Sequence, residues 1–411
     1  MEPERAVEPN RFPEIARLGV ADGAHSGVNE LLSTIPLVDH HTHSIATGRV
    51  DRESFVSMLT ESDRPAAALA TGMDSQVALA VRRWCAPLLG LSSHAAADEY
   101  LERRLAAGNE EAAAPLLRAA GFAGLLVDTG YRGDALLDLA ELGRMAAAPV
   151  ATIVRLETLA ERVATSGVEA ASFAGAFRAA LQAEAADAVG LKSIIAYRCG
   201  LDFDPAPPGA GEVTERAGAW LREIETSGAV RLVDPVLLRF VLWEGLAIGK
   251  PLQMHTGYGD TDLDLHRCDP LLLSNFLRAT EERCPVMLLH TYPFQRSAGY
   301  LAQMFPHVFL DVGLAVNYAG AQSAQIVAES LEVAPFTKIL FSSDAWGLPE
   351  LHLLGSWLFR RAMSRVIGAW VAHDDWSFAD AERVIRLVCA DNARRTYRLP
   401  DWWVPVGSRV E

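Results

Sequence analysis

Cysteines are few in this 411-residue chain, and they follow no recognisable pattern. The five are odd in number and scattered, and no CxxC pair occurs. This argues against a disulfide framework and against a cysteine-based zinc site. We therefore expect reduced thiols, as in a cytoplasmic protein. Cys199 follows a predicted strand without an evident base beside it in the sequence, so a thiol nucleophile is not indicated.

Positive charge and long apolar runs are also scarce. Lys and Arg number 37 against 52 Asp and Glu, which gives a formal net charge of -15. Such a chain lacks the basic surface that nucleic acid or an anionic membrane attracts. No apolar run approaches the ~20 residues of a membrane span, and the first ten residues contain no apolar core of a secretory signal. We expect a soluble cytoplasmic protein that acts on a small molecule.

Several catalytic and nucleotide-binding motifs are missing as well. The chain has no GxSxG elbow, no GxxxxGK[ST] loop and no GxGxxG after its first predicted strand. These absences leave a serine hydrolase of the α/β type, a P-loop nucleotide site and a dinucleotide site without support.

What the chain does contain is a series of eight short apolar runs with the composition of buried strands, separated mostly by helical stretches. Half of the residues are apolar, enough for a large core. Near-continuous apolar strands that alternate with helices predict a parallel sheet covered on its outer face. A closed (β/α)8 TIM barrel fits better than an open sheet, because candidate site residues come from early and late strands. The runs are residues 35–40, 122–128, 150–155, 189–198, 251–255, 285–290, 308–312 and 339–344.

The domain organisation follows from the spacing of these runs. Residues 1–32 are expected to form an N-terminal extension, and residues 33–411 a single barrel domain. Residues 51–120 are rich in Ala, Leu, Arg and Glu and predict a helical insertion after the first strand, placed over the mouth of the barrel as a lid. A last helix is expected over residues 378–397, with Ser377 as its N-cap.

Four histidines and one aspartate stand at the carboxyl ends of these runs. His41 and His43 are two residues apart and point the same way on a strand. His255, His290 and Asp344 end the fifth, sixth and eighth runs. In a parallel barrel these ends converge on one face, and imidazole and carboxylate are the usual ligands of Zn²⁺, Mn²⁺ or Fe²⁺. We predict one divalent metal ion, with zinc as the first choice, bound by His41, His43, His255 and Asp344.

Asp344 and His290 are the predicted catalytic residues. A bound metal lowers the pKa of water from 15.7 to about 7. Asp344 could bind the metal, accept the water's proton as general base and pass it to the leaving group as general acid. His290 would polarise the substrate carbonyl or hold the water in line. Any one such residue alone is more often structural, and only their joint pattern favours the metal site. His40 points to the opposite face and is expected to be structural.

The order HxH, His, His and Asp resembles the amidohydrolase superfamily, specifically amidohydrolase family 2, over roughly Pro36 to Leu399. Several segments are similar to its FluG-like branch, the amidohydrolase domain of nodulin/glutamine-synthetase-like proteins. The resemblance implies a (β/α)8 fold of the metal-dependent hydrolase type, one catalytic divalent metal and usually a hydrolysis. The similar segments are residues 190–198, 255–260, 289–294, 341–350 and 391–395.

Lys192 bears on the number of metal ions. Some members of the superfamily carry a carboxylated lysine on the fourth strand that bridges two metals. By alternation Lys192 would share a strand face with Ile194, Ala196 and Arg198 and lie in the middle of the strand, before the mouth. We therefore expect one metal, with Lys192 buried and paired or reaching the substrate. A second metal held by carboxylated Lys192 is the alternative.

Charged residues near the predicted mouth are candidates for binding the substrate. Arg155 and Arg198 close the third and fourth runs, and each could clamp a carboxylate or instead pair with a neighbour such as Glu157 or Asp128. Asp260, with Asp262 and Asp264 in the loop after the fifth run, could bind an amine. Weaker candidates near the mouth are Tyr292, Trp346, Glu350 and His352.

These features predict a metal-dependent hydrolase that cleaves a C–N bond of amide type. Its substrate would be small and would carry a carboxylate, and a γ-glutamyl amide is one candidate. Non-oxidative decarboxylation, uronate-type isomerisation and a catalytically inactive binding module are the alternatives. A homodimer or higher homo-oligomer is expected only on general grounds.

Overall fold

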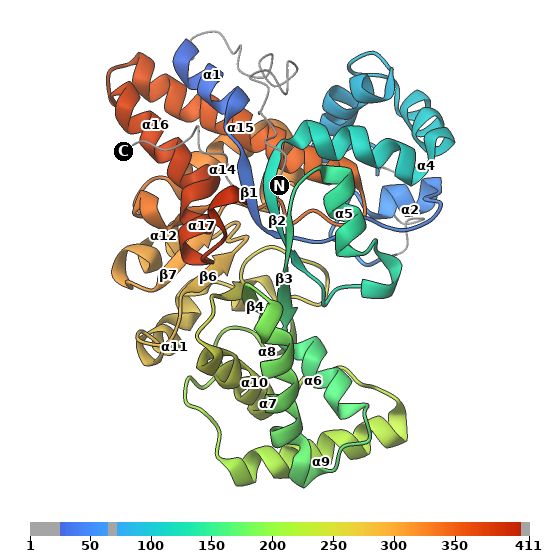
Figure 1. The fold of residues 1–411 in the computed structure, drawn as a ribbon, viewed down its shortest axis with the longest axis vertical. Helices are drawn as coiled ribbons and strands as arrows, with labels where there is room; N and C mark the ends of the chain where they lie inside the picture. The colour runs from blue at the N-terminus through green and yellow to red at the C-terminus, as the bar shows by residue number, and fades with distance from the viewer. Residues whose placement is uncertain (1–24, 65–71, 404–411) are drawn as a thin grey trace, which may run out of the picture.

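The computed structural model describes residues 25–64 and 72–403. Eight parallel strands form one sheet whose spatial order follows the chain order, with helices around it (Figure 1). The predicted (β/α)8 barrel is confirmed. The strands are β1 (Leu37–Thr42), β2 (Phe122–Asp128), β3 (Val150–Arg155), β4 (Gly190–Ser193), β5 (Leu252–His255), β6 (Val286–Leu289), β7 (Val308–Asp311) and β8 (Ile339–Leu340).

Backbone hydrogen bonds between β1 and the segment that follows β8 close the barrel. The Asp344 N–H donates to the carbonyl of His41 over 3.1 Å, and the His43 N–H donates to the carbonyl of Ala345 over 2.9 Å. Closure therefore places Asp344 directly beside the HxH pair, although the two lie near opposite ends of the sequence.

Helices cover the outside of the barrel and bury apolar side chains against it. α10 shows how the sequence defines such a helix: Pro235 occupies its first turn, and the Asp234 carboxylate caps it by accepting the N–H groups of Val236 and Leu237. These outer helices are α1 (Ser26–Thr34), α5 (Leu139–Ala146), α6 (Leu156–Ala164), α7 (Ala170–Asp187), α9 (Ala210–Ser227), α10 (Pro235–Ile248), α11 (Ser274–Ala279), α12 (Gln295–Met304), α13 (Ala315–Ala319), α14 (Ser323–Ser330) and α15 (Pro349–Ala372).

The residues predicted as a helical insertion hold α2 (Arg52–Ser57), α3 (Gln76–Ala80) and α4 (Ala97–Ala120). α4 packs against α15, where the indole N–H of Trp357 donates to the carbonyl of Ala119 over 2.8 Å. At Gly108 the helix is interrupted, because this residue has a φ of 73° that favours glycine. α4 therefore lies on one flank of the barrel in Figure 1, whereas residues 53–64 of the insertion line a cavity at its mouth.

The C-terminal helix is less regular than predicted. α16 (Phe378–Arg386) and α17 (Asn392–Thr396) are joined by a π-helical turn, and the helical path ends one residue before the predicted end. The predicted N-cap is confirmed, since the Ser377 hydroxyl accepts the Asp380 N–H over 3.1 Å. Further on, Trp403 packs over Gly124 of β2 so closely that a Cβ atom there would lie 2.2 Å from its ring. The C-terminal segment therefore seals one end of the barrel.

The fourth strand is shorter than predicted. β4 ends at Ser193, and the chain turns into the short helix α8 (Ala196–Cys199) instead of continuing to Arg198. The buried carboxylate of Glu157 accepts the Ser193 hydroxyl over 2.7 Å and the Ile194 N–H over 3.0 Å. Because this carboxylate takes the N–H that would continue the strand ladder, the alternation assumed for Lys192 does not extend to Arg198.

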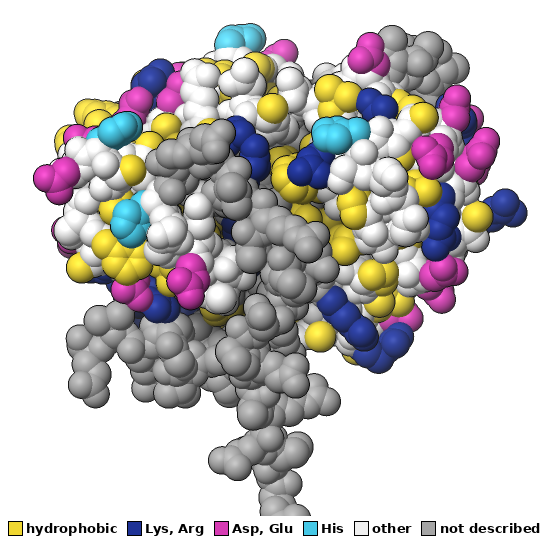
Figure 2. Space-filling view, turned by 90° about the horizontal axis from the view of Figure 1, so that it is seen from above, with side chains coloured by type: hydrophobic (Ala, Val, Ile, Leu, Met, Phe, Trp, Pro, Cys, Tyr) yellow, Lys and Arg dark blue, Asp and Glu magenta, His cyan; other side chains and the backbone are white. Residues whose placement is uncertain are grey.

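Acidic, basic and hydrophobic side chains are interspersed on the face of the molecule drawn in Figure 2. Among the described residues, none of the helices has both the length and the apolar character needed to span a membrane.

Candidate metal centre

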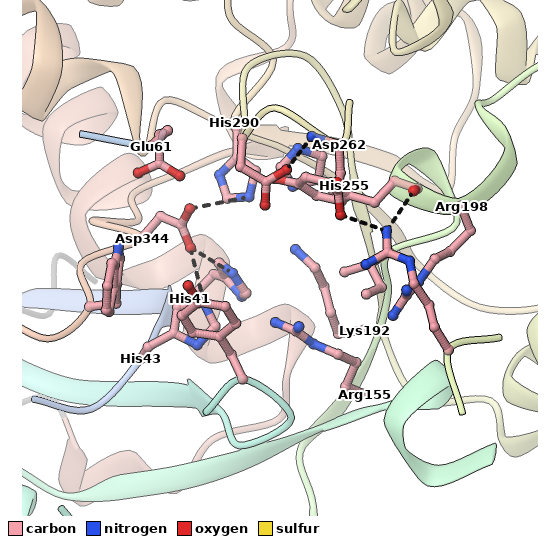
Figure 3. A pocket seen from close by; sticks show the side chains of 16 residues that line it. His41, His43, Glu61, Arg155, Lys192, Arg198, His255, Asp262, His290 and Asp344 are labelled. Atoms are coloured by element: carbon pink, nitrogen blue, oxygen red, sulfur yellow. Dashed lines mark hydrogen bonds and ion pairs between the residues drawn. The ribbon is translucent and has the colours of Figure 1, made fainter. Parts of the chain in front are cut away.

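Three of the four predicted metal ligands form one cluster at the carboxyl ends of β1 and β8 (Figure 3). His41 Nε2 lies 2.9 Å from Asp344 Oδ1, and His43 Nε2 lies 3.5 Å from the same oxygen. The three ligand atoms all lie within 4.8 Å of one another. This spacing suits groups that share one cation.

The hydrogen bonds behind His41 fix which ring nitrogen carries its proton. The side-chain amide N–H groups of Gln253 donate to the carbonyl of His40 over 2.7 Å and to the hydroxyl of Tyr397 over 2.8 Å. Gln253 Oε1 must therefore face His41 Nδ1, 2.8 Å away, and accept its proton. His41 Nε2 is left with a lone pair that points at Asp344.

His43 is oriented in the same way, because its Nδ1 donates to the carbonyl of Asp128 over 3.0 Å. Burial lowers the pKa of His41 to about 3, so its ring is neutral at pH 7. The lone pair of His41 and the Asp344 carboxylate therefore face each other with no proton between them, which is repulsive unless a cation lies there. The donor set fits a divalent metal ion.

His255 lies beside this cluster and not within it. Its ring centroid is 4.7 Å from that of His290 and 4.3 Å from that of Tyr197. Its Nε2 is buried and has no hydrogen-bond partner among the described residues. Burial holds the pKa of His255 well below its usual value, so a lone pair is available there too.

The two predicted catalytic residues both have strained backbones. His290 has a φ of 71° and Asp344 a φ of 47°, in the left-handed region that non-glycine residues rarely adopt. The Asp311 carboxylate holds His290 in place by accepting its backbone N–H over 2.6 Å. His290 Nε2 lies 3.5 Å from Asp344 Oδ2, on the side away from His41. Strain at two facing polar residues is typical of a functional site.

The cluster lies at the bottom of a cavity of about 210 Å³. All the predicted site residues line it except Asp264, Tyr292, Glu350 and His352. The structure thus brings together residues from most strands of the barrel. Those in the cavity wall are His41, His43, Arg155, Lys192, Arg198, His255, Asp260, Asp262, His290, Asp344 and Trp346.

Arg155 is paired with its neighbour Asp128, which was the predicted alternative to binding a substrate carboxylate. Its Nη2 and Nε lie 2.6 Å and 3.0 Å from Asp128 Oδ2. Burial alone would raise the pKa of Asp128, but Arg155 holds it well below its usual value. Arg155 therefore lines the cavity with its charge already compensated.

Arg198 differs because two of its donors have no partner. Its side chain is 7% exposed, and its Nη2 lies 3.3 Å from Glu161 Oε1. Its Nε and Nη1 are buried without a hydrogen-bond partner among the described residues. Buried donors of a charged group are costly to leave unpaired, so this guanidinium suits an anionic group in the cavity.

Lys192 lies at the end of β4 and reaches the cavity (Figure 3), which corrects its predicted place before the mouth. Burial lowers the pKa of its ammonium group to about 8. Within residues 25–64 and 72–403, the cluster of His41, His43 and Asp344 is the one group of three or more His, Cys, Asp or Glu side chains spaced for a metal. Lys192 is therefore placed near one candidate metal position.

Glu350 and Tyr292 do not face the cavity, so their predicted contact with substrate is corrected. Glu350 is fully buried in α15, where its Oε1 lies 2.5 Å from Arg104 Nε and accepts the Tyr100 hydroxyl over 3.0 Å. The Glu350 carboxylate is therefore neutralised by Arg104 and is not available to a substrate. Tyr292 is 40% exposed and packs edge-on against Tyr258.

Several residues in the cavity wall were not foreseen. Glu61, in the insertion, accepts the Tyr318 hydroxyl over 2.6 Å, and burial together with the nearby Asp344 carboxylate raises the pKa of Glu61 to about 7. The expected position of the insertion over the mouth was the one signal that could have suggested it. The others missed are Tyr131, Tyr197 and Arg231.

Comparison with known proteins supports the predicted family and fold. The Amidohydrolase family profile matches residues 230–399. Protein fluG of Emericella nidulans is 28% identical over 418 aligned residues, which cover 91% of this chain and 47% of that protein. The chain thus spans about half the length of this curated relative.

Solved structures share the fold over nearly the whole chain. A protein described as a metal-dependent hydrolase, from Lactobacillus casei ATCC 334, is 30% identical with a TM-score of 0.79, and the match covers 90% of this chain and 96% of that one. A glucuronate isomerase from Caulobacter crescentus is 17% identical with a TM-score of 0.61, covering 96% and 99% of the two chains. At that identity the isomerase shows a common fold and no more.

Proposed function

The chain belongs to the amidohydrolase family, in its FluG-like branch, and from that premise we propose that it is a metal-dependent hydrolase of a C–N bond of amide type. We propose a small substrate that carries a carboxylate, with a γ-glutamyl amide as the first candidate. One observation carries the proposal: the cluster of His41, His43 and Asp344 shares a cavity with the unpaired donors of Arg198.

His41, His43 and Asp344 would hold the metal ion, through two Nε2 atoms and a carboxylate oxygen, and His255 has a free lone pair beside them. Zinc is the proposed identity because nitrogen and carboxylate ligands suit it, and Mn²⁺ or Fe²⁺ is the alternative. When bound, the ion supplies Lewis-acid polarisation and a water of lowered pKa.

The protein's own residues handle the protons. Asp344 Oδ2 faces His290, so this oxygen is placed to accept a proton from the attacking water and to deliver it to the leaving nitrogen. Asp344 must be ionised to bind a divalent metal ion, so its carboxylate would begin the reaction able to accept a proton. His290 would orient the carbonyl of the substrate.

Arg198→Lys is expected to weaken the binding of the substrate carboxylate. Lysine keeps the charge but loses the two unpaired guanidinium donors, Nε and Nη1, so KM should rise about tenfold or more with little change in kcat. Steady-state kinetics on an amide with a free carboxylate, and on its uncharged methyl ester, would measure this. Arg222→Lys, on an exposed part of α9, is the matched control. An equal loss on both substrates would contradict a carboxylate-binding role.

Removing the metal is expected to abolish activity reversibly. A chelator should reduce amide hydrolysis to background, and zinc should restore it with one ion bound per chain. Elemental analysis and a screen of γ-glutamyl and N-acyl amides for released amine would test both points. Two ions per chain after loading in bicarbonate would show that carboxylated Lys192 holds a second metal. Full activity in metal-free protein would refute the proposal.

Non-oxidative decarboxylation is the second candidate, because the donors of Arg198 would hold a carboxylate in that reaction as well. The same screen separates the two reactions. Release of CO₂ without an amine would favour decarboxylation.

A further inference from the structure

A second cavity, of about 350 Å³, adjoins the metal cavity at its mouth. The two share Glu61, Tyr131, Asp260 and Trp346 as common walls. The insertion supplies much of the outer cavity, through residues 53–64. The Thr261 hydroxyl donates to the Asp63 carboxylate and so ties the insertion to the loop after β5. A substrate bound at the metal centre can therefore extend into a second compartment that the insertion encloses.

The two ends of this joined space differ in charge. Arg155, Lys192 and Arg198 lie on one side of the metal cavity, whereas Glu61 lies across it next to Asp344 (Figure 3). The outer cavity has more acidic than basic side chains in its wall. The acidic ones are Glu53, Glu61, Asp63 and Asp260, and the basic ones are Arg64 and Arg132.

Glu61 and Asp260 are the acidic groups that belong to both cavities. Neither has an ion pair with a basic side chain among the described residues, although Asp63 lies 3.9 Å from Arg64 and Asp262 lies 2.9 Å from Arg231. Burial raises the pKa of Glu61 and of Asp260, and the nearby Arg231 acts to lower the pKa of Asp260. Tyr131 and Trp346 form an aromatic corner beside them, with ring centroids 5.5 Å apart.

An independent observation shows that the same space is built for a charged ligand. Arg198 lines the metal cavity with two buried donors that have no partner, and its side chain is only 7% exposed. Uncompensated donors at one end and uncompensated carboxyl groups at the other suit a molecule that carries both charges. An anion alone would satisfy only the first end.

We propose that the leaving amine of the amide substrate carries a second, positively charged amino group, which Glu61 and Asp260 bind at the mouth. This inference rests on the proposed C–N hydrolysis and specifies its substrate class, a carboxylate-bearing amide of a diamine. Water oxygen bonds to the carbonyl carbon, the C–N bond breaks, and the leaving nitrogen takes the proton held at Asp344. The products are a dicarboxylate or amino dicarboxylate and the free diamine.

The test uses two amides that differ in one group. The metal-loaded protein is assayed with the γ-glutamyl monoamide of 1,4-diaminobutane and with γ-glutamyl pentylamide, in which a methyl group replaces the terminal ammonium. We expect kcat/KM to be about tenfold or more higher for the cationic amide, through KM. Glu61→Gln and Asp260→Asn should each reduce this ratio several-fold, because a neutral amide attracts the terminal ammonium less strongly than a carboxylate does. Glu102→Gln, an equal loss of charge on an exposed part of α4, should leave the ratio unchanged.

Wild-type protein gives a test that does not depend on the folding of a variant. Free 1,4-diaminobutane should inhibit more strongly than pentylamine. Equal turnover of the two amides would overturn this inference and leave C–N hydrolysis intact, whereas no turnover of either would overturn both. Glutaryl amides, which lack the α-ammonium of glutamate, identify the group that is bound. If Glu61→Gln no longer lowers the preference for the cationic amide when glutaryl amides are used, Glu61 binds the α-ammonium of the acyl part, and the proposal is wrong.

Discussion

Asp344→Asn is expected to lower kcat/KM by about 10³-fold or more and to reduce the bound metal to a small fraction. The amide keeps the shape of the side chain but loses its negative charge and its capacity to carry a proton. Its NH₂ group would also stand 2.9 to 3.5 Å from imidazole nitrogens that now face a carboxylate. Elemental analysis and kinetics on a responsive amide would measure the two effects together.

The matched control is Asp264→Asn, which makes the same change at an exposed position in the loop after β5. It should leave the metal content and kcat/KM within about twofold of wild type, since surface changes rarely have large effects. A D344N protein that binds metal fully and turns over normally would show that the cluster is not the catalytic centre.

Breaking the buried ion pair between Arg104 and Glu350 should have the largest effect on stability. Both side chains are fully buried, and Arg104 also donates to Asn109 Oδ1 over 2.5 Å. Arg104→Met would leave a carboxylate buried without its cation, so the free energy of unfolding should fall by about 3–5 kcal/mol. Urea denaturation followed by circular dichroism would measure it.

The double variant Arg104→Met with Glu350→Leu removes both charges and should recover much of the loss, because no unpaired charge remains. Arg296→Met, which breaks an exposed pair with Glu332, should have little measurable effect. Equal losses in the single and the double variant would mean that Arg104 acts through packing and not through its charge.

The barrel and the cluster of His41, His43 and Asp344 were predictable because their signals are short-range. An apolar run is visible within about six residues, and eight such runs, three of them ending in histidine, imply a closed parallel sheet. Closure then requires that the end of β8 lie beside β1, which brings Asp344 to His41 without any further information. The place of His255, next to the three-residue cluster and not inside it, depends on ring orientations that strand periodicity does not define.

The residues that were misplaced depend on partners far away in the sequence. The fourth strand ends at Ser193 because the Glu157 carboxylate, from α6, takes the next backbone N–H. Glu350 faces away from the cavity because Arg104, in the insertion, neutralises it. Glu61 could not be singled out, since nothing in the insertion's sequence says which of its acidic residues turns inward. The pattern of apolar residues thus predicts each helix or strand, but it does not predict which charged side chains pair with one another.

The hydroxyl of Tyr397 touches both His40 and the Gln253 amide that sets the proton on His41. Without Tyr397 in place, the Gln253 amide would keep only one of the two acceptors that turn its Oε1 toward His41. A residue just after α17 thus helps to set the tautomer of a histidine on the first strand.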